Sequence, residues 1–270
     1  MLDLSLLTGA PLYSLFIGFC AVMAVAISKA GFGGSLGALS TPIMVLAFSP
    51  VHALGILLPI FIVIDIWVVW HWRKLGVRRI IFWMVFFGLA GQLAGWALLR
   101  FGAFDDSILL LFIGLMGIAT GAKYFIEIFL MRPTSHHIRQ RIKSVRSRVI
   151  GRASIWCSFA GFTSFVSLTG GIPVQVYLLP FRLPRQIFVG TMAWFFLSIN
   201  AAKLPFFIDL NFITGATLSM TALLLIFVPI GVMTGRWLNQ KMSDKVFYVI
   251  AHILLLLLGI QLLWRYLSAY

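Results

Sequence analysis

Long runs of apolar residues alternate with short polar stretches along the whole chain. A helix needs about 20 predominantly apolar residues to cross the hydrocarbon core of a bilayer. By that length we expect membrane segments at residues 11–31, 34–48, 51–71, 80–100, 107–129, 153–168, 171–181, 186–204, 211–234 and 246–267. The pattern therefore predicts an all-α, polytopic membrane protein.

Two of these segments are too short to cross a membrane alone. At 1.5 Å per residue, segments 34–48 and 171–181 reach only about 22 Å and about 17 Å. A glycine pair stands at the start of each, Gly33–Gly34 in the first case and Gly170–Gly171 in the second. We expect broken or short helices at these two glycine motifs, and the sequence leaves open whether they are re-entrant or spanning.

Composition and charge agree with a membrane location. Hydrophobic residues make up 61% of the chain and charged residues 10%, whereas a soluble domain is about half apolar and about a quarter charged. The net charge of +14 comes from short basic stretches between apolar segments, as the positive-inside rule requires. We therefore expect the lipid bilayer, and no nucleic acid, as a partner.

Few residues in the chain suggest covalent or metal chemistry. Cys20 and Cys157 both lie in apolar stretches, so no disulfide framework is expected. No group of histidines, cysteines or acids has metal-ligand spacing, and no nucleophile stands beside a base. We expect no metal site, no cofactor and no enzymatic activity.

The distribution of lysine and arginine predicts the orientation. The stretch 131–152 carries seven arginines and lysines and no acid, so we place it in the cytoplasm. Counting outward from it places both termini outside a bacterial cytoplasmic membrane. The turns that contain Asp105–Asp106 and Asp209 then also lie outside.

Four pairs of motifs recur in the same order in the two halves of the chain. They are Cys20 with Cys157, Gly33–Gly34 with Gly170–Gly171, Pro50–Gly55 with Pro184–Gly190, and Gly91–Gly95 with Gly231–Gly235. We therefore divide the chain into a first repeat (1–130), a basic linker (131–152) and a second repeat (153–270), with about five segments in each repeat. Since Pro50 would lie outside and Pro184 inside, the repeats are inverted across the membrane.

Inverted repeats with interrupted helices near the midplane are typical of secondary transporters. A helix that starts at a break presents free N–H groups and a positive dipole end, which together favour an anion. The candidate binding residues at the breaks are Gly33, Gly34, Ser35, Thr169, Gly170, Gly171 and Gln175. For the Gly91–Gly95 and Gly231–Gly235 pairs we prefer helix packing.

Asp65, Asn200, Lys29 and Lys203 lie within the apolar segments, where such residues are costly and often functional. Asp65 falls opposite Asn200 when the repeats are aligned at Gly55 and Gly190. Asp65 could couple or gate transport by carrying a proton, or it could be a structural acid paired with a lysine. Lys29 could attract an anion or extend to the inner surface, and Lys203 could line an anion path or extend outward.

Two stretches of the chain resemble a known family. "GFGGSLGALSTPIMVL" followed after two residues by "SPVHALGILLPIFIVID", and "TGGIPVQVYLLPFRLPRQIFVGTMAWFFLSINAAKLP", are similar to the two repeats of the sulfite exporter TauE/SafE family of small membrane transporters. The resemblance implies secondary transport of small sulfur-containing anions, such as sulfite or organosulfonates. It places the family's glycine motifs at Gly31, Gly33, Gly34, Pro42, Gly170, Gly171 and Pro173, with Ser35 where many relatives have a third glycine.

We therefore expect a transporter that binds a small anion between the two breaks and works by alternating access. An anion channel and a membrane scaffold or assembly protein are the alternatives. The sequence leaves open the direction of transport, the coupling ion and whether the protein forms a homo-oligomer.

Overall fold

The structure, a computed structural model, describes residues 12–34, 37–101 and 146–268, together with the isolated positions 115, 118, 122, 125 and 126. Its helices are α2 (Leu12–Phe32), α3 (Gly37–Val45), α4 (Pro50–Trp72), α5 (Arg78–Phe101), α8 (Arg146–Ser167), α9 (Gly171–Leu178), η2 (Leu179–Phe181), α10 (Arg185–Asp209), α11 (Gly215–Leu224), η3 (Leu225–Phe227), α12 (Val228–Lys241) and α13 (Asp244–Ser268). The described residues contain no strand, and five helical stretches among them are long and apolar enough to cross a membrane. The expected all-α polytopic membrane protein is confirmed.

The helix boundaries differ from the expected segments in three places. α8 begins at Arg146, inside the stretch expected to be linker. α10 continues through Pro205 to Asp209, where the buried Phe207 side chain anchors its last turn. The segment expected at 211–234 is divided into α11, η3 and α12, because Pro229 has no N–H to continue the helical hydrogen bonds. The segment expected at 107–129 falls almost entirely outside the described residues.

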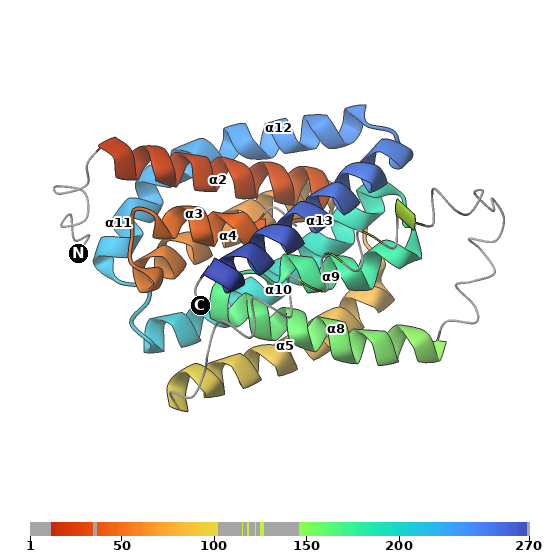
Figure 1. Cartoon of the computed structure of the whole chain (residues 1–270), viewed down its shortest axis with the longest axis horizontal. Coiled ribbons are helices and arrows are strands. Elements are labelled where there is room, and N and C mark those ends of the chain that lie inside the picture. The colour runs from red at the N-terminus through yellow and green to blue at the C-terminus, as the bar shows by residue number, and fades with distance from the viewer. Residues whose placement is uncertain are drawn as a thin grey trace.

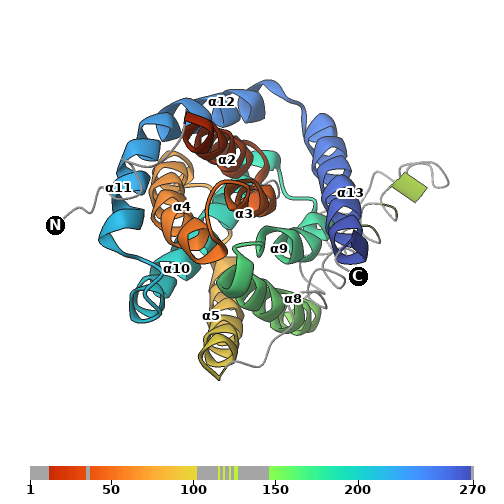
Figure 2. The same cartoon turned by 60° about the vertical axis from the view of Figure 1, so that its left-hand side comes forward.

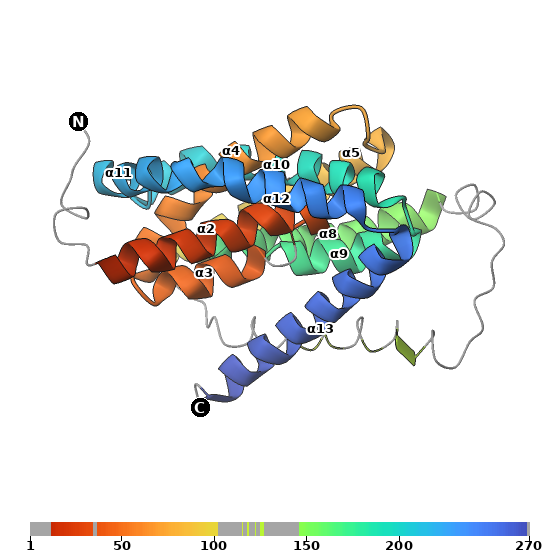
Figure 3. The same cartoon turned by 90° about the horizontal axis from the view of Figure 1, so that it is seen from above.

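The two short helices lie inside the bundle and extend toward opposite ends of it. Figure 2 shows α3 and α9 enclosed by the longer helices, and Figure 3 shows α3 in one half of the bundle's length and α9 in the other. α2 and α8, which precede them, run in opposite directions (Figure 1). This is the arrangement expected of two inverted repeats.

The contacts between the halves are reciprocal. α5 of the first half packs along α8 of the second, α12 of the second half packs along α2 of the first, and α4 packs against α10. Gly55 on α4 lies against the Phe212 carbonyl after α10, whereas Gly190 on α10 lies against the Leu75 carbonyl after α4. Each of these contacts from the first half to the second therefore has an equivalent contact from the second half to the first, as a two-fold relation requires.

Glycines permit the close approach of α5 to α8 and of α12 to α2. A methyl group at Gly91 would overlap the Ser158 carbonyl, and one at Gly235 would overlap the Ile27 carbonyl. One at Gly231 would lie 2.5 Å from the Ala26 Cβ. The expectation that these glycines serve helix packing is confirmed, and such contacts are typical of membrane helices.

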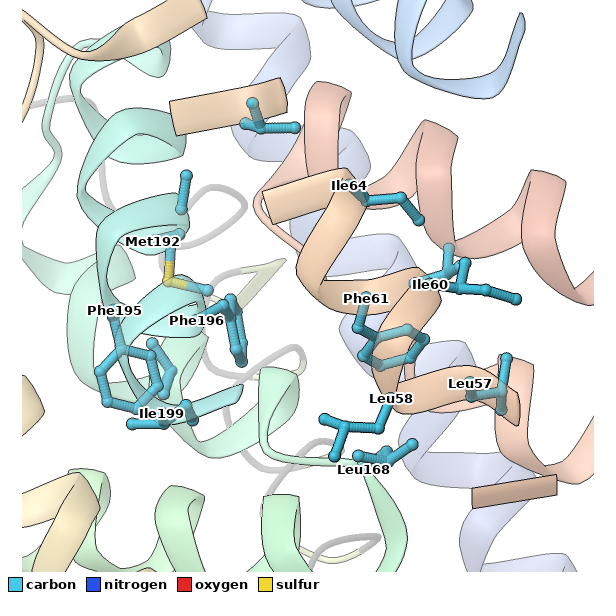
Figure 4. Packing of buried hydrophobic residues seen from close by; sticks show 14 of the residues in the cluster. Leu57, Leu58, Ile60, Phe61, Ile64, Leu168, Met192, Phe195, Phe196 and Ile199 are labelled. Carbon is cyan, nitrogen blue, oxygen red and sulfur yellow. The ribbon is translucent and has the colours of Figure 1, made fainter. Parts of the chain in front are cut away.

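A cluster of buried apolar side chains fills the space between α4 and α10. Leu57, Ile60 and Phe61 from α4 and Met192 and Phe196 from α10 belong to it (Figure 4). Large apolar side chains are also exposed on the outside of the bundle, among them Phe16, Ile66, Phe82, Ile230 and Trp264. An apolar exterior around a packed interior is the surface that a lipid bilayer requires.

Candidate functional site

Two glycines allow the backbone turn at the first helix break, and a side chain from the other half binds a carbonyl group at the end of α2. Gly33 and Gly34 have φ values of 73° and 97°, a region that favours glycine. The Gly34 N–H donates to the Ser28 carbonyl at 3.0 Å. The Gln175 amide, from α9, donates to the Phe32 carbonyl at 2.9 Å. Carbonyl groups freed at the end of α2 are thus satisfied inside the protein.

The second break is closed in a reciprocal way. α8 ends at Ser167, and Leu168 follows with a φ of 59°. The Thr41 hydroxyl, from α3, donates to the Ser167 carbonyl at 3.0 Å. Each short helix therefore caps the end of the first helix of the opposite half.

The binding groups expected at the start of α9 are mostly engaged. The Ile172 N–H points to the Thr169 carbonyl at 3.4 Å, and the Val174 N–H points to the Gly170 carbonyl at the same distance. The Thr169 and Ser167 hydroxyls share a hydrogen bond of 2.7 Å. These long backbone bonds are weak, since most N–H···O bonds measure about 2.9–3.0 Å. Ser35, expected at the start of the other short helix, lies outside the described residues.

Gln175 has a different partner from the one expected. Its amide nitrogen was expected to donate to an oxyanion, and instead it donates to a backbone carbonyl of α2. That carbonyl accepts only, so the orientation of the amide is fixed and the Oε1 atom faces elsewhere. Oε1 is buried and has no hydrogen-bond partner.

Lys29 and Asp65 form a buried ion pair between α2 and α4. The Lys29 ammonium lies 2.7 Å from both carboxylate oxygens, and the side chains are 5% and 1% exposed. The ammonium also lies 4.5 Å from the Phe61 ring centroid and 4.9 Å from that of Phe196, which adds cation–π attraction. Lys29 therefore does not extend to the inner surface, because the acid and two rings hold it in the interior.

Asn200 connects this ion pair to a second lysine. Its amide nitrogen donates to Asp65 Oδ2 at 2.7 Å, and its Oδ1 accepts from Lys203 at 2.8 Å. Asn200 thus contacts the residue that lies opposite it in the sequence alignment of the repeats. Phe61 and Phe196 are also equivalent in that alignment, four residues before Asp65 and Asn200 respectively.

Lys203 is a buried cation that contacts only neutral acceptors. Its ammonium donates to Asn200 Oδ1, to the Ser164 carbonyl at 2.9 Å and to the Ser164 hydroxyl at 2.8 Å. These three bonds use all three donors of an ammonium group. The side chain is 0% exposed. The alternative in which Lys203 extends outward is wrong, because these acceptors satisfy it in the interior.

Each buried lysine lies beside one glycine break. A methyl group added to Gly34 would lie 3.5 Å from Lys29 Cγ and 3.2 Å from the Phe196 ring. One added to Gly170 would lie 2.6 Å from Cβ of Ser164, which binds Lys203. The structure thus brings together the two breaks and the four polar residues that the sequence singled out.

Several contributors to this region were not expected from the sequence. Ser164 accepts from Lys203 twice, the Phe61 and Phe196 rings flank Lys29, and Thr41 caps α8. The Asn239 amide donates to the Gly31 carbonyl at 2.8 Å. The repeat alignment held a signal for the two phenylalanines, since it places them opposite each other.

Among the described residues, no group of three or more histidines, cysteines, aspartates or glutamates could hold a metal ion. Cys20 and Cys157 are free thiols. The chemistry available at this site is therefore that of two cations, one carboxylate and neutral hydrogen-bonding groups.

The apolar helices, the inverted halves and the broken helices around buried charges define a polytopic membrane protein built as transporters are. The family model of the sulfite exporter TauE/SafE family matches residues 17–262. The chain therefore belongs to this family of membrane transporters. The comparisons with curated proteins and with solved structures gave no match.

Proposed function

We propose that the protein is a secondary transporter that moves sulfite or a small organosulfonate across the bacterial cytoplasmic membrane by alternating access. The observation that carries this proposal is the environment of Lys203, a fully buried cation whose hydrogen-bond partners are all neutral. A buried charge is costly unless it is paired. A small anion that enters the site would supply the missing negative charge.

The anion would bind between the two breaks. Lys203 and Asn200 supply donors on α10, and Thr169, Gly170 and Gly171 lie at the start of α9, beside Ser164. Gly33 and Gly34 form the opposite wall next to Lys29. In this closed arrangement the neutral Ser164 and Asn200 acceptors are the groups that an anion displaces most easily, because they hold Lys203 with weaker bonds than a carboxylate would.

Alternating access follows from the reciprocal caps. Gln175 and Thr41 each hold the first helix of one repeat to the short helix of the other. Rocking one repeat against the other breaks one cap and preserves the other, so the site opens to one side at a time. Asp65 would carry a proton in a coupled cycle, because it is the carboxylate that neutralises Lys29.

The orientation proposed from the sequence fits the ends of the helices. The end of α4, the start of α10 and the end of α12 lie at one end of the bundle (Figure 1). Basic residues stand at or next to these helix ends: Arg73 and Lys74, Arg185, and Lys241. The Arg185 Nε donates to the Asn239 carbonyl at 2.8 Å, so two of these ends are in direct contact. We place this end in the cytoplasm.

The test is flux of labelled sulfite, and then of simple sulfonates, in proteoliposomes with and without an imposed pH gradient. Accumulation of sulfite against its own gradient is expected when the pH gradient is imposed, and it would exclude a channel. The Lys203→Gln variant should lose at least about tenfold in flux, since a unit charge within a few ångströms is worth more than 1.4 kcal/mol at an effective dielectric of about 20. The matched control is Lys241→Gln, at an exposed lysine, which should retain flux.

A scaffold or assembly role is the alternative from another class. It predicts no flux of any sulfur anion through folded protein, and no effect of Lys203→Gln beyond stability. Equal flux in the Lys203→Gln and Lys241→Gln variants would remove Lys203 from the site.

A further inference from the structure

The buried charges of the site give it a net charge, and that net charge selects among anions. Within the part of the chain that the structure describes, the buried Lys, Arg, Asp and Glu side chains are Lys29, Lys203 and Asp65. With their ordinary charges, two lysines and one aspartate leave one net positive charge. The remaining polar groups that face them are neutral: Ser164 from α8 and Asn200 from α10.

We propose that the site accepts a monoanion directly and accepts a dianion only together with one proton. This proposal rests on the transport function proposed above and specifies the substrate class for the same site. A monoanion paired with Lys203 makes the interior neutral. A dianion leaves one unpaired negative charge among buried side chains, which is strongly unfavourable.

The geometry identifies where the proton would go. Asp65 accepts from Lys29 through both oxygens and from Asn200 through Oδ2. If a proton from the aqueous side binds an Asp65 oxygen, the carboxylate becomes neutral and Lys29 becomes a second uncompensated cation. Lys29 and Lys203 can then pair with both charges of a dianion, and Asn200, which contacts both Asp65 and Lys203, lies between the two positions.

Among sulfur oxyanions, the charge of the anion rather than its shape would then decide whether a proton is needed. Sulfonates and bisulfite carry one charge and need no proton from the protein. Sulfite and sulfate each carry two charges, so each would bind only when the protein takes up one proton. The same protein would thus move sulfonates without proton uptake, and move a dianion with one proton.

The experiment compares the binding of methanesulfonate and sulfate to purified protein at mildly alkaline pH by calorimetry. Neither probe changes its protonation state under these conditions. Repeating the titrations in buffers of different ionisation enthalpy counts the protons taken up. In the unmodified protein we expect methanesulfonate to bind without proton uptake, and sulfate to bind more weakly and with one proton taken up per anion.

Charge variants then test the cause. Asp65→Asn should raise the affinity for sulfate relative to methanesulfonate by at least about tenfold, because the site gains a positive charge within a few ångströms of the anion. The double variant Lys29→Gln with Asp65→Asn restores a single net positive charge and should restore the preference for methanesulfonate. The matched control Asp209→Asn removes an acid that is 53% exposed and should leave the preference unchanged.

The outcomes separate the two proposals. If neither anion binds and no sulfur anion is transported, the proposed function fails. If anions bind but sulfate binds the unmodified protein as tightly as methanesulfonate and without proton uptake, the charge rule is overturned and the transport function stands. If Asp65→Asn fails to fold, proton counting in the unmodified protein still decides the rule.

Discussion

Asn200 donates to Asp65 Oδ2 at 2.7 Å, and the two residues occupy equivalent positions in the two repeats, each ten residues after a matching glycine, Gly55 or Gly190. Two equivalent points related by a two-fold axis can touch only if both lie beside that axis. For inverted repeats the axis lies in the plane of the membrane. We therefore expect the Asp65–Asn200 contact to lie near the midplane of the bilayer, where the electrostatic consequences of each charge are largest.

Removing one member of the ion pair between Lys29 and Asp65 should destabilise the protein far more than removing both. Lys29→Met leaves a buried carboxylate without its cation, and we expect a loss of about 3–5 kcal/mol in the free energy of unfolding. Lys29→Met combined with Asp65→Leu removes both charges and should recover most of that loss. Thermal unfolding of the purified variants in one detergent measures this difference.

The double variant also separates stability from transport. It should be folded and yet transport a dianion poorly, because the second cation is gone. A double variant as unstable as Lys29→Met alone would show that the packing of these side chains, rather than their charge, sets the stability.

Gly34 should tolerate no side chain, even a methyl group. Its φ of 97° costs an L-residue about 1–2 kcal/mol, and the added Cβ would crowd Phe196 and Lys29. We expect Gly34→Ala to reduce sulfite flux several-fold in protein that still reaches the membrane. The Gly151→Ala variant is the control, because a Cβ there meets no atom within 4 Å.

If Gly34→Ala and Gly151→Ala transport equally well, the first break is not close to the anion. A loss of membrane-inserted protein in Gly34→Ala would instead assign the glycine to folding. Comparing flux with the amount of protein recovered in the membrane distinguishes these results.

The sequence was sufficient to predict the all-α membrane fold and to single out the buried polar residues, but not most of their partners. The length of the apolar runs predicted the membrane helices, and the alignment of the repeats placed Asp65 opposite Asn200. Both signals can be read directly from the order of residues along the chain. The partner of Gln175 is a backbone carbonyl 143 residues earlier, and a carbonyl carries no side-chain signal. Lys29 and Lys203 each had two open interpretations, since the distance from a lysine to the membrane surface depends on packing that only the tertiary structure defines.

The polar cap provided by Thr41 should stabilise the second break. Thr41→Val preserves the shape of the side chain and leaves the Ser167 carbonyl without its 3.0 Å hydrogen bond. We expect a loss of up to about 1–3 kcal/mol, because the part-buried Ser167 carbonyl has lost its partner. Thr234→Val is the matched control, because the Thr234 hydroxyl donates to an exposed carbonyl of its own helix and should cost less than about 1 kcal/mol.

Hydrogen exchange at the end of α8 provides the second measurement. Faster exchange confined to that end in Thr41→Val would place the loss at the second break. A uniform change over the whole bundle would contradict a local cap.

The orientation of the bundle can be read from single cysteines placed at its two ends. Ser243 is exposed between α12 and α13, and Asp209 is exposed at the end of α10. In a background where Cys20 and Cys157 are replaced by alanine, a membrane-impermeant maleimide should label the Asp209→Cys variant in intact cells. It should label the Ser243→Cys variant only after the cells are opened, because the positive-inside rule places the basic end in the cytoplasm. Labelling of the Ser243→Cys variant alone in intact cells would reverse the orientation while leaving the helix arrangement and the site unchanged.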